Sequence, residues 1–459
     1  MPRNHTQAAK SPRLSKRTIA QSTAFVEMWL DRHFHHNIIP GLSFSLHKDG
    51  QPLISQQWGH ADTENKTPLT DQHVFRAASI AKIFTAAATG ILADEGKLDI
   101  EDLIVKHLPW LKENKAMRHI RIRHLLSHTG GIAREGGISA DYWNMNVPFP
   151  DRAVLQDVTK DMTPVFNRTG KLKYSNWGYA LLGEVIAQAA QQSYDDLIRS
   201  RIIDPAGLTS TFTDAPQVAA DRTTASHLYT GTRTPRTIET YVSTASFAPA
   251  TGLCSTADDL CRFLHAFNHG LVSDEMKSFL ITPLHKIDGD PELLIGHGFM
   301  TSGNDEYAIT GHGGFFSGQM TAAYMHPASG ITLSACSNTQ SVDAVSLVEN
   351  AWATFRFFHE NERALNTEHA RTVSGRYTNT LDDLHVLATT KVAAILDLAE
   401  EDLWGNADIL TSDDGGIHYL DANAGEMEHK AEPSTFTVEQ GSVRLRHQSI
   451  TLRKTLDFS

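Results

Sequence analysis

The chain has 459 residues, more than one hydrophobic core usually supports, so we expect two domains. Hydrophobic residues make up 41% and charged residues 20%, a balance typical of globular proteins. The net charge of −12 argues against a nucleic-acid-binding protein, which needs a basic face, and against docking on anionic membranes. The longest apolar runs are too short to span a bilayer, so we expect no membrane span.

The first 20 residues contain several basic side chains and no acidic one. They lack the apolar stretch of a secretory signal, so we expect a disordered basic arm over 1–20 and a cytoplasmic protein. The three cysteines, Cys254, Cys261 and Cys336, show neither a paired framework nor metal-ligand spacing. We expect them to be reduced and mostly buried.

A histidine cluster, His33, His35 and His36, follows the basic arm. Nothing nearby offers a third ligand with a defined spacing, and a solvated helix face explains the cluster as well as a metal site does. We therefore expect no metal and no cofactor.

The predicted elements begin with two strands. Apolar residues alternate over 42–46 and return over 53–58, and the Asp-Gly within 48–50 is a hairpin signal between them. Apolar residues at helical spacing over 80–92 then predict a helix. The stretch 98–285 is predicted to be loop-rich with further helices, the clearest of which starts at about 178.

Strand signals return in the second half of the chain as an antiparallel meander. The runs are 299–301, 307–309, 320–324 and 331–335, separated by turn signals that include the glycines between 311 and 318. Strands at both ends and helices between them predict an α+β domain over 21–362. It would contain one antiparallel sheet flanked by helices, with a helical lobe inserted.

The composition changes after about residue 365. Turn signals recur at 412–416 and 440–441, and partial alternation appears over 443–452. We expect a small, separate β-rich domain over 370–459. Residues 381–403 are rich in Leu and Ala, and their pattern fits a strand or a helix.

The first candidate for chemistry is Ser79-Ile80-Ala81-Lys82. Three residues apart on a helix, the hydroxyl and the amine share a face. A serine becomes nucleophilic when a neighbour takes its proton, and a lysine can do this if burial lowers its pKa. The N-terminus of the helix also offers N–H groups to an oxyanion.

The second candidate is Tyr174-Ser175-Asn176, just before a predicted helix. Tyr174 is placed either to accept the Ser79 proton as a phenolate or to relay it to a leaving group. Asn176 is placed to hold a substrate amide or the Lys82 amine. The structural alternative is that Asn176 is simply the N-cap of the following helix.

The third candidate is His312-Gly313-Gly314, followed by Phe315. Glycines allow backbone to approach a ligand closely. We expect the backbone N–H of Phe315 to complete an oxyanion hole with that of Ser79. An incidental histidine in a glycine-rich turn is the alternative.

The order of these three elements resembles the serine β-lactamase-related family. That family includes class C β-lactamases, D,D-carboxypeptidases, D-aminopeptidases and family VIII esterases. The resemblance covers about 35–345 and also rests on residues 75–78, 125–131, 177–183 and 252–260. It implies a β-lactamase/transpeptidase-like fold, and some relatives carry a lipocalin-like barrel that fits the predicted C-terminal domain. We interpret 125–131 as a structural loop.

By this resemblance, Ser79 is the acylated nucleophile, and Lys82 with Tyr174 is the acid/base pair. Asn176 and His312 position the substrate. Many β-lactamases have Lys where this chain has His312, and a neutral His suits a substrate carboxylate less well. The resemblance therefore implies a peptidase or esterase more than an efficient β-lactamase.

The expected function is hydrolysis of a D-amino-acid-containing peptide, small amide or ester through an acyl-enzyme. One alternative is transfer of the same acyl group to an amine or alcohol. Another is a non-catalytic, filament-forming or structural relative, which the presence of all the candidate groups disfavours. The expected partner is a small molecule or short peptide, and the sequence leaves a homo-oligomer open.

Overall fold

A computed structural model describes residues 12–166, 170–228, 236–287, 290–379, 383–413, 415–416, 418–421, 434–439, 442–447 and 450–457. The chain forms two compact units. One consists of Ile39–Val348, and the other combines Arg13–Ile38 with Glu349–Ser459.

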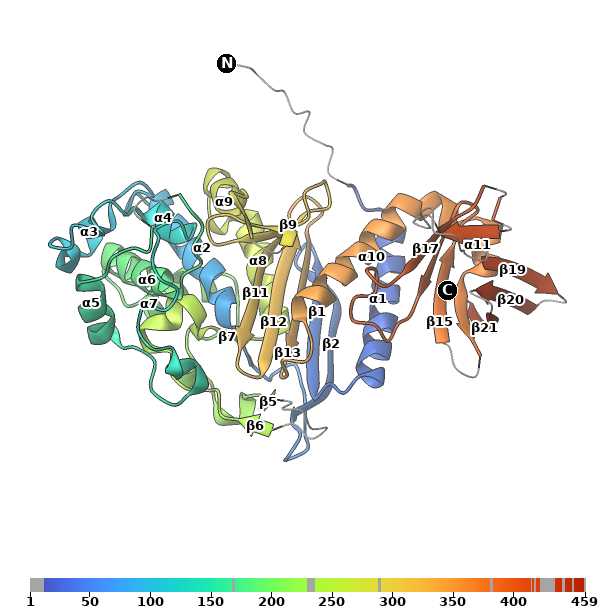
Figure 1. Cartoon of the computed structure of the whole chain (residues 1–459), viewed down its shortest axis with the longest axis horizontal. Helices are drawn as coiled ribbons and strands as arrows, with labels where there is room; N and C mark the ends of the chain where they lie inside the picture. Colours follow the sequence, from blue (N-terminus) through green and yellow to red (C-terminus); the bar gives the residue numbers. More distant parts are fainter. Residues whose placement is uncertain are drawn as a thin grey trace, which may run out of the picture. The chain divides into compact units, whose positions relative to one another are not determined.

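The first unit is built on a nine-stranded sheet in the order β3-β2-β1-β13-β12-β11-β10-β9-β8, and every paired neighbour is antiparallel. Its strands are β1 Gly41–Lys48, β2 Gln51–Asp62, β3 Thr67–Pro68, β8 His285–Ile287, β9 Asp290–Ile295, β10 Met300–Ser302, β11 Ile309–Phe316, β12 Gln319–His326 and β13 Ile331–Ser337. The pairing of β1 with β13 joins strands from the two ends of the unit, as the sequence predicts (Figure 1). The predicted hairpin between β1 and β2 turns at Asp49 and Gly50, both with positive φ.

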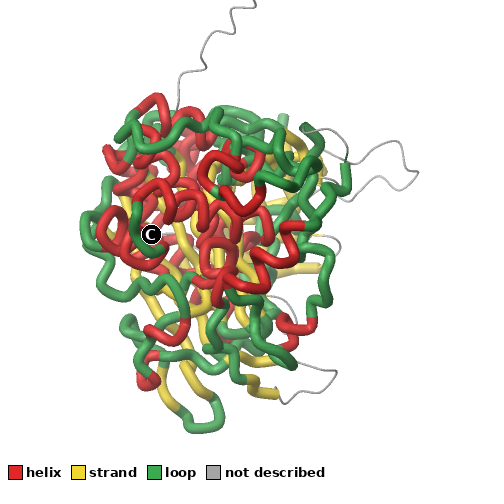
Figure 2. The backbone as a smooth tube through the Cα atoms, turned by 90° about the vertical axis from the view of Figure 1, so that its left-hand side faces the viewer, coloured by secondary structure: helices red, strands yellow, loops and turns green. Residues whose placement is uncertain are grey.

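A helical lobe is inserted between β3 and β8. Its helices are α2 Ala81–Asp94, α3 Ile104–His107, α4 Ile122–Leu126, α5 Arg152–Lys160, α6 Asn176–Ala190, α7 Tyr194–Ile198, α8 Ala257–Ala266 and α9 Asp274–Ile281. Two short pairs also form, β4 Phe75–Arg76 with β7 Cys254–Ser255, and β5 Ser226–Leu228 with β6 Arg236–Ile238. Helix α8 packs on β1, β12 and β13, and in Figure 2 the helices of the lobe stand in front of the strands.

Helix α2 is the centre of the lobe. Its residues from Ala81 to Leu92 are all buried, as expected for a helix that is apolar on every side. It packs against α6, α9 and the short helix η8 Ala248–Gly252. The single turn η1 Ala78–Ile80 leads into α2, so the lobe and the sheet meet at Ser79.

The second unit contains a closed barrel of eight strands that follow one another in chain order. They are β14 Gly375–Thr378, β15 Asp383–Ala388, β16 Val392–Leu396, β17 Asp408–Thr411, β18 His418–Asp421, β19 Ser434–Glu439, β20 Ser442–His447 and β21 Ile450–Asp457. Its helices are α1 Lys16–His36, α11 Glu368–Val373 and, from Glu349 on, α10 Ala344–Leu365. The predicted β-rich segment is thus a barrel, and the ambiguous 381–403 region holds strands β15 and β16. The turn expected at 440–441 lies outside the described residues.

Helix α1 changes the expected N-terminal boundary. Residues 16–20 are helical instead of part of an arm, while 1–11 lie outside the described residues. The apolar side of α1 is buried within the second unit: the ring centroid of Phe25 lies 5.3 Å from that of His385, and the indole of Trp29 donates to the Glu400 carbonyl. Residues 21–38 group by their contacts with the second unit, whereas the sequence assigned them to the domain that starts at residue 21. An amphipathic pattern does not tell which partner covers its apolar face.

Three local predictions can be compared with the structure. The three cysteines are buried and form no disulfide. His33 is buried with its ring on the Ala399 carbonyl at 3.0 Å, whereas His35 and His36 are exposed on α1, so a solvated face describes only the last two. In the described part of the chain, no three His, Cys, Asp or Glu side chains gather as a metal site.

The glycines of 311–314 lie inside β11, where the sequence suggested a turn between strands. A Cβ added at Gly311 would lie 1.9 Å from the Ala323 carbonyl oxygen, so close packing with β12 requires this glycine. The turn itself comes later, at Gly318, which has positive φ. Among the described residues, no helix has the length and apolar character needed to cross a membrane.

Candidate active site

Ser79 sits at the sharp entry to α2. The preceding Ala78 has φ of 49°, a left-handed conformation that costs a residue with a Cβ about 1–2 kcal/mol. Two contacts hold this turn: the Ala77 N–H donates to the Leu253 carbonyl, and Thr321 Oγ1 donates to the Ala77 carbonyl. Such strain persists because its surroundings determine it, and it fixes the direction of the Ser79 side chain.

The structure brings Ser79, Lys82 and Tyr174 into direct contact. Lys82 Nζ lies 3.1 Å from Ser79 Oγ, and the Tyr174 hydroxyl lies 3.2 Å from the same atom. Lys82 Nζ also donates to the carbonyl oxygen of Ala250 at 2.7 Å. It lies 4.8 Å from the centre of the Tyr174 ring. Two residues that can exchange protons therefore flank one hydroxyl.

Burial sets the protonation states of this group. It lowers the pKa of the Lys82 amine well below its usual range, and the positive charge of Arg134 acts in the same direction. Burial also raises the pKa of Tyr174 to about 12. A neutral amine beside a protonated phenol is therefore the favoured state, so the amine is better suited than a phenolate to take the Ser79 proton.

Asn176 begins α6, but it does not cap the helix. The N-cap is Ser175, whose hydroxyl accepts from the Gly178 N–H at 2.9 Å, so the alternative of an Asn176 cap was wrong. The Asn176 amide instead donates from Nδ2 to Glu135 at 2.8 Å. Its Oδ1 is buried without a hydrogen-bond partner, which leaves an acceptor available to a ligand.

His312 lies on β11, with its ring centroid 6.3 Å from that of Tyr174. Its Nδ1 lies 2.5 Å from the Gly313 carbonyl oxygen, which can only accept, so Nδ1 carries the proton. Nε2 is buried without a partner and is an acceptor. Burial, followed by the charge of Lys82, lowers the pKa of His312 to about 3, so the ring is neutral.

The glycines after His312 place the strand against the Ser79 turn. A Cβ at Gly314 would lie 2.2 Å from the Ala77 carbonyl oxygen, and one at Gly313 would lie 2.8 Å from Val345. Phe315 follows on the same strand, and 55% of its side chain is exposed. All the residues predicted from the three motifs therefore come together at the meeting of β11, α2 and α6.

A cavity of about 380 Å³ opens onto Ser79. It is lined by Ser79, Arg134, Glu135, Ala140, Trp143, Asn176, Phe315 and Ser317. A larger cavity of about 690 Å³ lies between α6 and residues 245–249 and is lined by none of the predicted site residues. The chemistry therefore belongs to the smaller cavity.

Motif analysis missed Arg134 and Glu135. The Glu135 carboxylate accepts from Asn176 and from the Tyr142 hydroxyl, both at 2.8 Å, and Arg134 lies 3.2 Å from it. The Arg134 side chain is 65% exposed at the cavity. Their only signal in the sequence is a charged pair before Gly136-Gly137, in a loop whose path cannot be derived from the sequence.

The Beta-lactamase family model matches residues 26–354. Penicillin-binding protein 4* of Bacillus subtilis is 32% identical over 167 residues, 35% of this chain and 35% of that protein. Protein flp of Staphylococcus aureus is 30% identical over 191 residues, 40% of this chain and 37% of that protein. The matched stretches thus span a little over a third of each relative's length.

Two solved structures are similar in fold. The octameric penicillin-binding protein homologue from Pyrococcus abyssi has a TM-score of 0.62 at 20% identity, covering 95% of this chain and 100% of that one. A D-stereospecific amidohydrolase from Streptomyces sp. has a TM-score of 0.60 at 22% identity, covering 72% of this chain and 97% of that one. The predicted fold class is confirmed, as is the resemblance to the β-lactamase-related family. The chain belongs to the Beta-lactamase family.

Proposed function

We propose that this chain is a serine hydrolase that forms an acyl-enzyme on Ser79. The observation that carries the proposal is the position of Ser79 Oγ, within 3.2 Å of both a buried lysine amine and a tyrosine hydroxyl. Neutral Lys82 accepts the Oγ proton while Oγ forms a bond to the substrate carbonyl carbon. The carbonyl electrons move to its oxygen, giving a tetrahedral oxyanion.

The backbone N–H groups of Ser79 and Phe315 are proposed to hold that oxyanion. Support comes from their common cavity and from the packing of Gly314 against Ala77, which draws β11 toward the serine turn. When the oxyanion collapses, the bond to the leaving nitrogen or oxygen breaks. The Tyr174 hydroxyl gives its proton to that atom and regains one from the Lys82 ammonium.

Deacylation repeats these steps with water as the nucleophile. Lys82 takes a water proton, the hydroxyl oxygen bonds to the acyl carbon, and Ser79 Oγ leaves with a proton from the Lys82–Tyr174 pair. Tyr174 serves as a neutral relay here, because its raised pKa of about 12 disfavours a phenolate.

The proposed substrate is a D-amino-acid-containing peptide, small amide or ester. The neutral state of His312 leaves β11 without a fixed cation for a carboxylate at this position. The cavity combines the aromatic surfaces of Trp143 and Phe315 with the charged Arg134 and Glu135. The Asn176 Oδ1 acceptor suits a substrate N–H. The fold shared with a D-stereospecific amidohydrolase supports the same class.

The test combines turnover with mass spectrometry. The protein is incubated with D-alanine amides, short-chain p-nitrophenyl esters and a penicillin, and the modified residue is located by peptide mapping. We expect an acyl adduct on Ser79, ester turnover that Ser79→Ala abolishes, and fluorophosphonate labelling that is lost in the same variant.

Ser317→Ala is the matched control for labelling, since Ser317 lines the same cavity and its hydroxyl contacts the Trp143 carbonyl instead of a base. Labelling that persists in Ser79→Ala would refute the proposal. Product analysis with an added amine separates hydrolysis from acyl transfer, which would appear as transfer product at low amine concentration.

Self-association is a separate proposal. The Pyrococcus abyssi homologue of similar fold is octameric, and the similarity in fold covers 95% of this chain. Mass photometry of the purified chain tests it, with a single peak at 50.6 kDa as the outcome that excludes an oligomer.

A further inference from the structure

Arg76 is a buried cation three residues before the nucleophile. It belongs to β4, pairs with Cys254 on β7, and has no solvent-exposed surface. Its guanidinium lies 4.1 Å from the centre of the Phe316 ring, and its Nη1 donates to the Val242 carbonyl at 3.4 Å. Nε and Nη2 have no hydrogen-bond partner. A charge buried in this way requires a nearby counter-charge.

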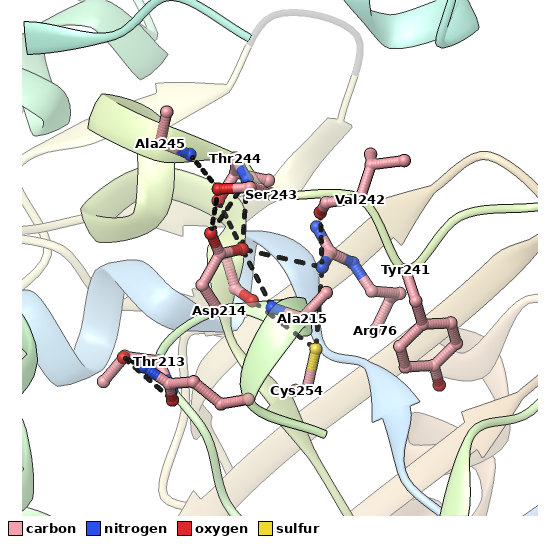
Figure 3. A network of polar contacts seen from close by, with 12 residues as sticks. Arg76, Thr213, Asp214, Ala215, Tyr241, Val242, Ser243, Thr244, Ala245 and Cys254 are labelled. Carbon is pink, nitrogen blue, oxygen red and sulfur yellow. Dashed lines mark hydrogen bonds and ion pairs between the residues drawn. The ribbon is translucent and has the colours of Figure 1, made fainter. Parts of the chain in front are cut away.

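Asp214 supplies that counter-charge. One carboxylate oxygen lies 3.8 Å from Arg76 Nη1 (Figure 3). The same carboxylate accepts from the Thr244 N–H at 3.0 Å, the Thr244 hydroxyl at 2.9 Å and the Ser243 hydroxyl at 2.7 Å. It also accepts from the Ala215 N–H at 2.9 Å. Asp214 thus links the buried Arg76 of β4 to residues 243–244.

Residues 243–244 start the segment that reaches α2. Ala245 follows with φ of 47°, a left-handed conformation that must be held by its neighbours. The segment then continues through η7 Ala245–Phe247 into η8. A Cβ at Gly252, where η8 ends, would lie 2.7 Å from Thr244 Oγ1, so the segment folds back closely on its own start.

Two successive carbonyl groups of η8 meet α2. The Pro249 carbonyl accepts from Thr85 Oγ1 at 2.7 Å, and the Ala250 carbonyl accepts from Lys82 Nζ at 2.7 Å. With one Lys82 N–H fixed on Ala250, the lone pair of the neutral amine is directed elsewhere, and Ser79 Oγ lies 3.1 Å away. The position of Ala250 therefore governs how well Lys82 takes the serine proton.

We propose that Asp214 is a positioning residue for Lys82: balanced by buried Arg76, it anchors the 243–252 segment that presents the Ala250 carbonyl to the amine. This inference rests on the proposed function. Asp214 touches neither substrate nor reacting atoms and acts entirely through the backbone of η8.

The test uses Asp214→Asn, which keeps the size of the side chain but removes its charge and turns one acceptor into a donor. We expect kcat for a p-nitrophenyl ester to fall about 10- to 100-fold, as a misplaced catalytic group causes, with KM little changed. The acid limb of the kcat profile should also move to lower pH. An ammonium that loses a carbonyl acceptor is less stable, so its pKa falls.

Asp62→Asn is the matched control. Asp62 also accepts from backbone N–H groups, those of Glu64 and Asn65, but it is the last residue of β2. Its kcat and pH profile should match those of the unmodified protein. An Asp214→Asn protein that is folded by circular dichroism and retains full kcat and the same acid limb would overturn the inference.

Ser243→Ala covers the case in which Asp214→Asn does not fold. It removes one donor to Asp214 and the acceptor for the Ala245 N–H, but it leaves the buried charge pair intact. We expect a smaller fall in kcat in the same direction, and an unchanged kcat would again overturn the inference. If the unmodified protein is not labelled on Ser79, the proposed function fails; if it is labelled and both variants match it, only this inference fails.

Discussion

The imidazole of His128 stacks on the phenol of Tyr174, with ring centroids 4.3 Å apart and planes 25° apart. His128 Nδ1 also accepts the Ser175 N–H at 3.0 Å. Burial lowers the pKa of His128, so the ring is neutral and keeps this acceptor. One side chain thus fixes both the ring and the backbone that bring the Tyr174 hydroxyl to Ser79. The interpretation of 125–131 as a structural loop agrees with this supporting role.

Replacing His128 with Asn tests this support. Asn tolerates the left-handed backbone of position 128, where φ is 55°, and retains an acceptor, but it lacks the stacking ring. We expect kcat to fall about 10-fold or more because the Tyr174 hydroxyl is less well placed, with the protein still folded. His119→Asn, at an exposed position, is the control. Equal kcat in the two variants would contradict the prediction.

The pH profile tests the base. Lys82 must be neutral to accept a proton, so kcat/KM should fall as the pH drops through the pKa of its amine. Burial lowers that pKa well below the usual lysine value of 10.5, so the fall should occur at a lower pH than 10.5. Lys82→Arg remains charged at every accessible pH and should lose about 10²- to 10⁴-fold in kcat. A Lys82→Arg protein that keeps the same acid limb would show that another group is the base.

Titration of His312 should not affect the pH dependence of kcat/KM near neutral pH. Its pKa of about 3 keeps the ring neutral near pH 6.5. The pH profiles of kcat/KM for the unmodified protein and for His312→Gln should therefore both lack an inflection at 6.5. The amide of Gln can still donate to the Gly313 carbonyl. An inflection near 6.5 that disappears in this variant would mean that the protonated ring binds substrate.

Acid stability gives a second readout for the same residue. The folded pKa of His312 is depressed, so the unfolded chain binds more protons than the folded one below the usual value of 6.5. Its contribution to stability is complete above pH 6.5 and is lost as pH falls from there toward 3. Urea unfolding of His312→Gln between pH 7 and 4 should show a shallower loss than the unmodified protein.

Helix α6 offers a stability test based on two glycines. A Cβ at Gly183 would lie 2.2 Å from Pro249 Cγ, so Gly183→Ala should lower the free energy of unfolding by about 1–3 kcal/mol. At Gly178 the nearest atom would be 3.4 Å away, and Ala there should be neutral or stabilising by up to about 1 kcal/mol. Thermal unfolding of both variants checks the prediction. The melting temperature should fall for Gly183→Ala and should stay the same or rise for Gly178→Ala.

The sequence predicts the parts of the site that depend on local periodicity. Ser79 and Lys82 are three residues apart, so chain spacing alone brings them together, and the helix after Tyr174 is also visible in the sequence. The glycines at 311 and 314 are different, because their role is to allow contact with Ala323 and Ala77, which are distant in the sequence. A glycine pattern does not distinguish a turn from a tightly packed strand.

The two carboxylates that hold loops near the site, Glu135 and Asp214, were not predicted from the sequence. Glu135 and Asp214 each accept hydrogen bonds from residues on other segments, and neither stands in a recognisable motif. Their partners are set by the paths of loops, which hydrophobic patterns do not define. For the same reason, the sequence gives the amphipathic pattern of α1 but not the unit to which that helix belongs.

The second unit is discontinuous in the chain, since Arg13–Ile38 joins Glu349–Ser459 across the whole of the first unit. During synthesis, α1 leaves the ribosome before the strands of its own unit have been made. Phe25 and Trp29 of α1 contact residues of the second unit that are translated only after more than 300 intervening residues. The two parts of the second unit are therefore made at different times, with the whole of the first unit synthesised between them.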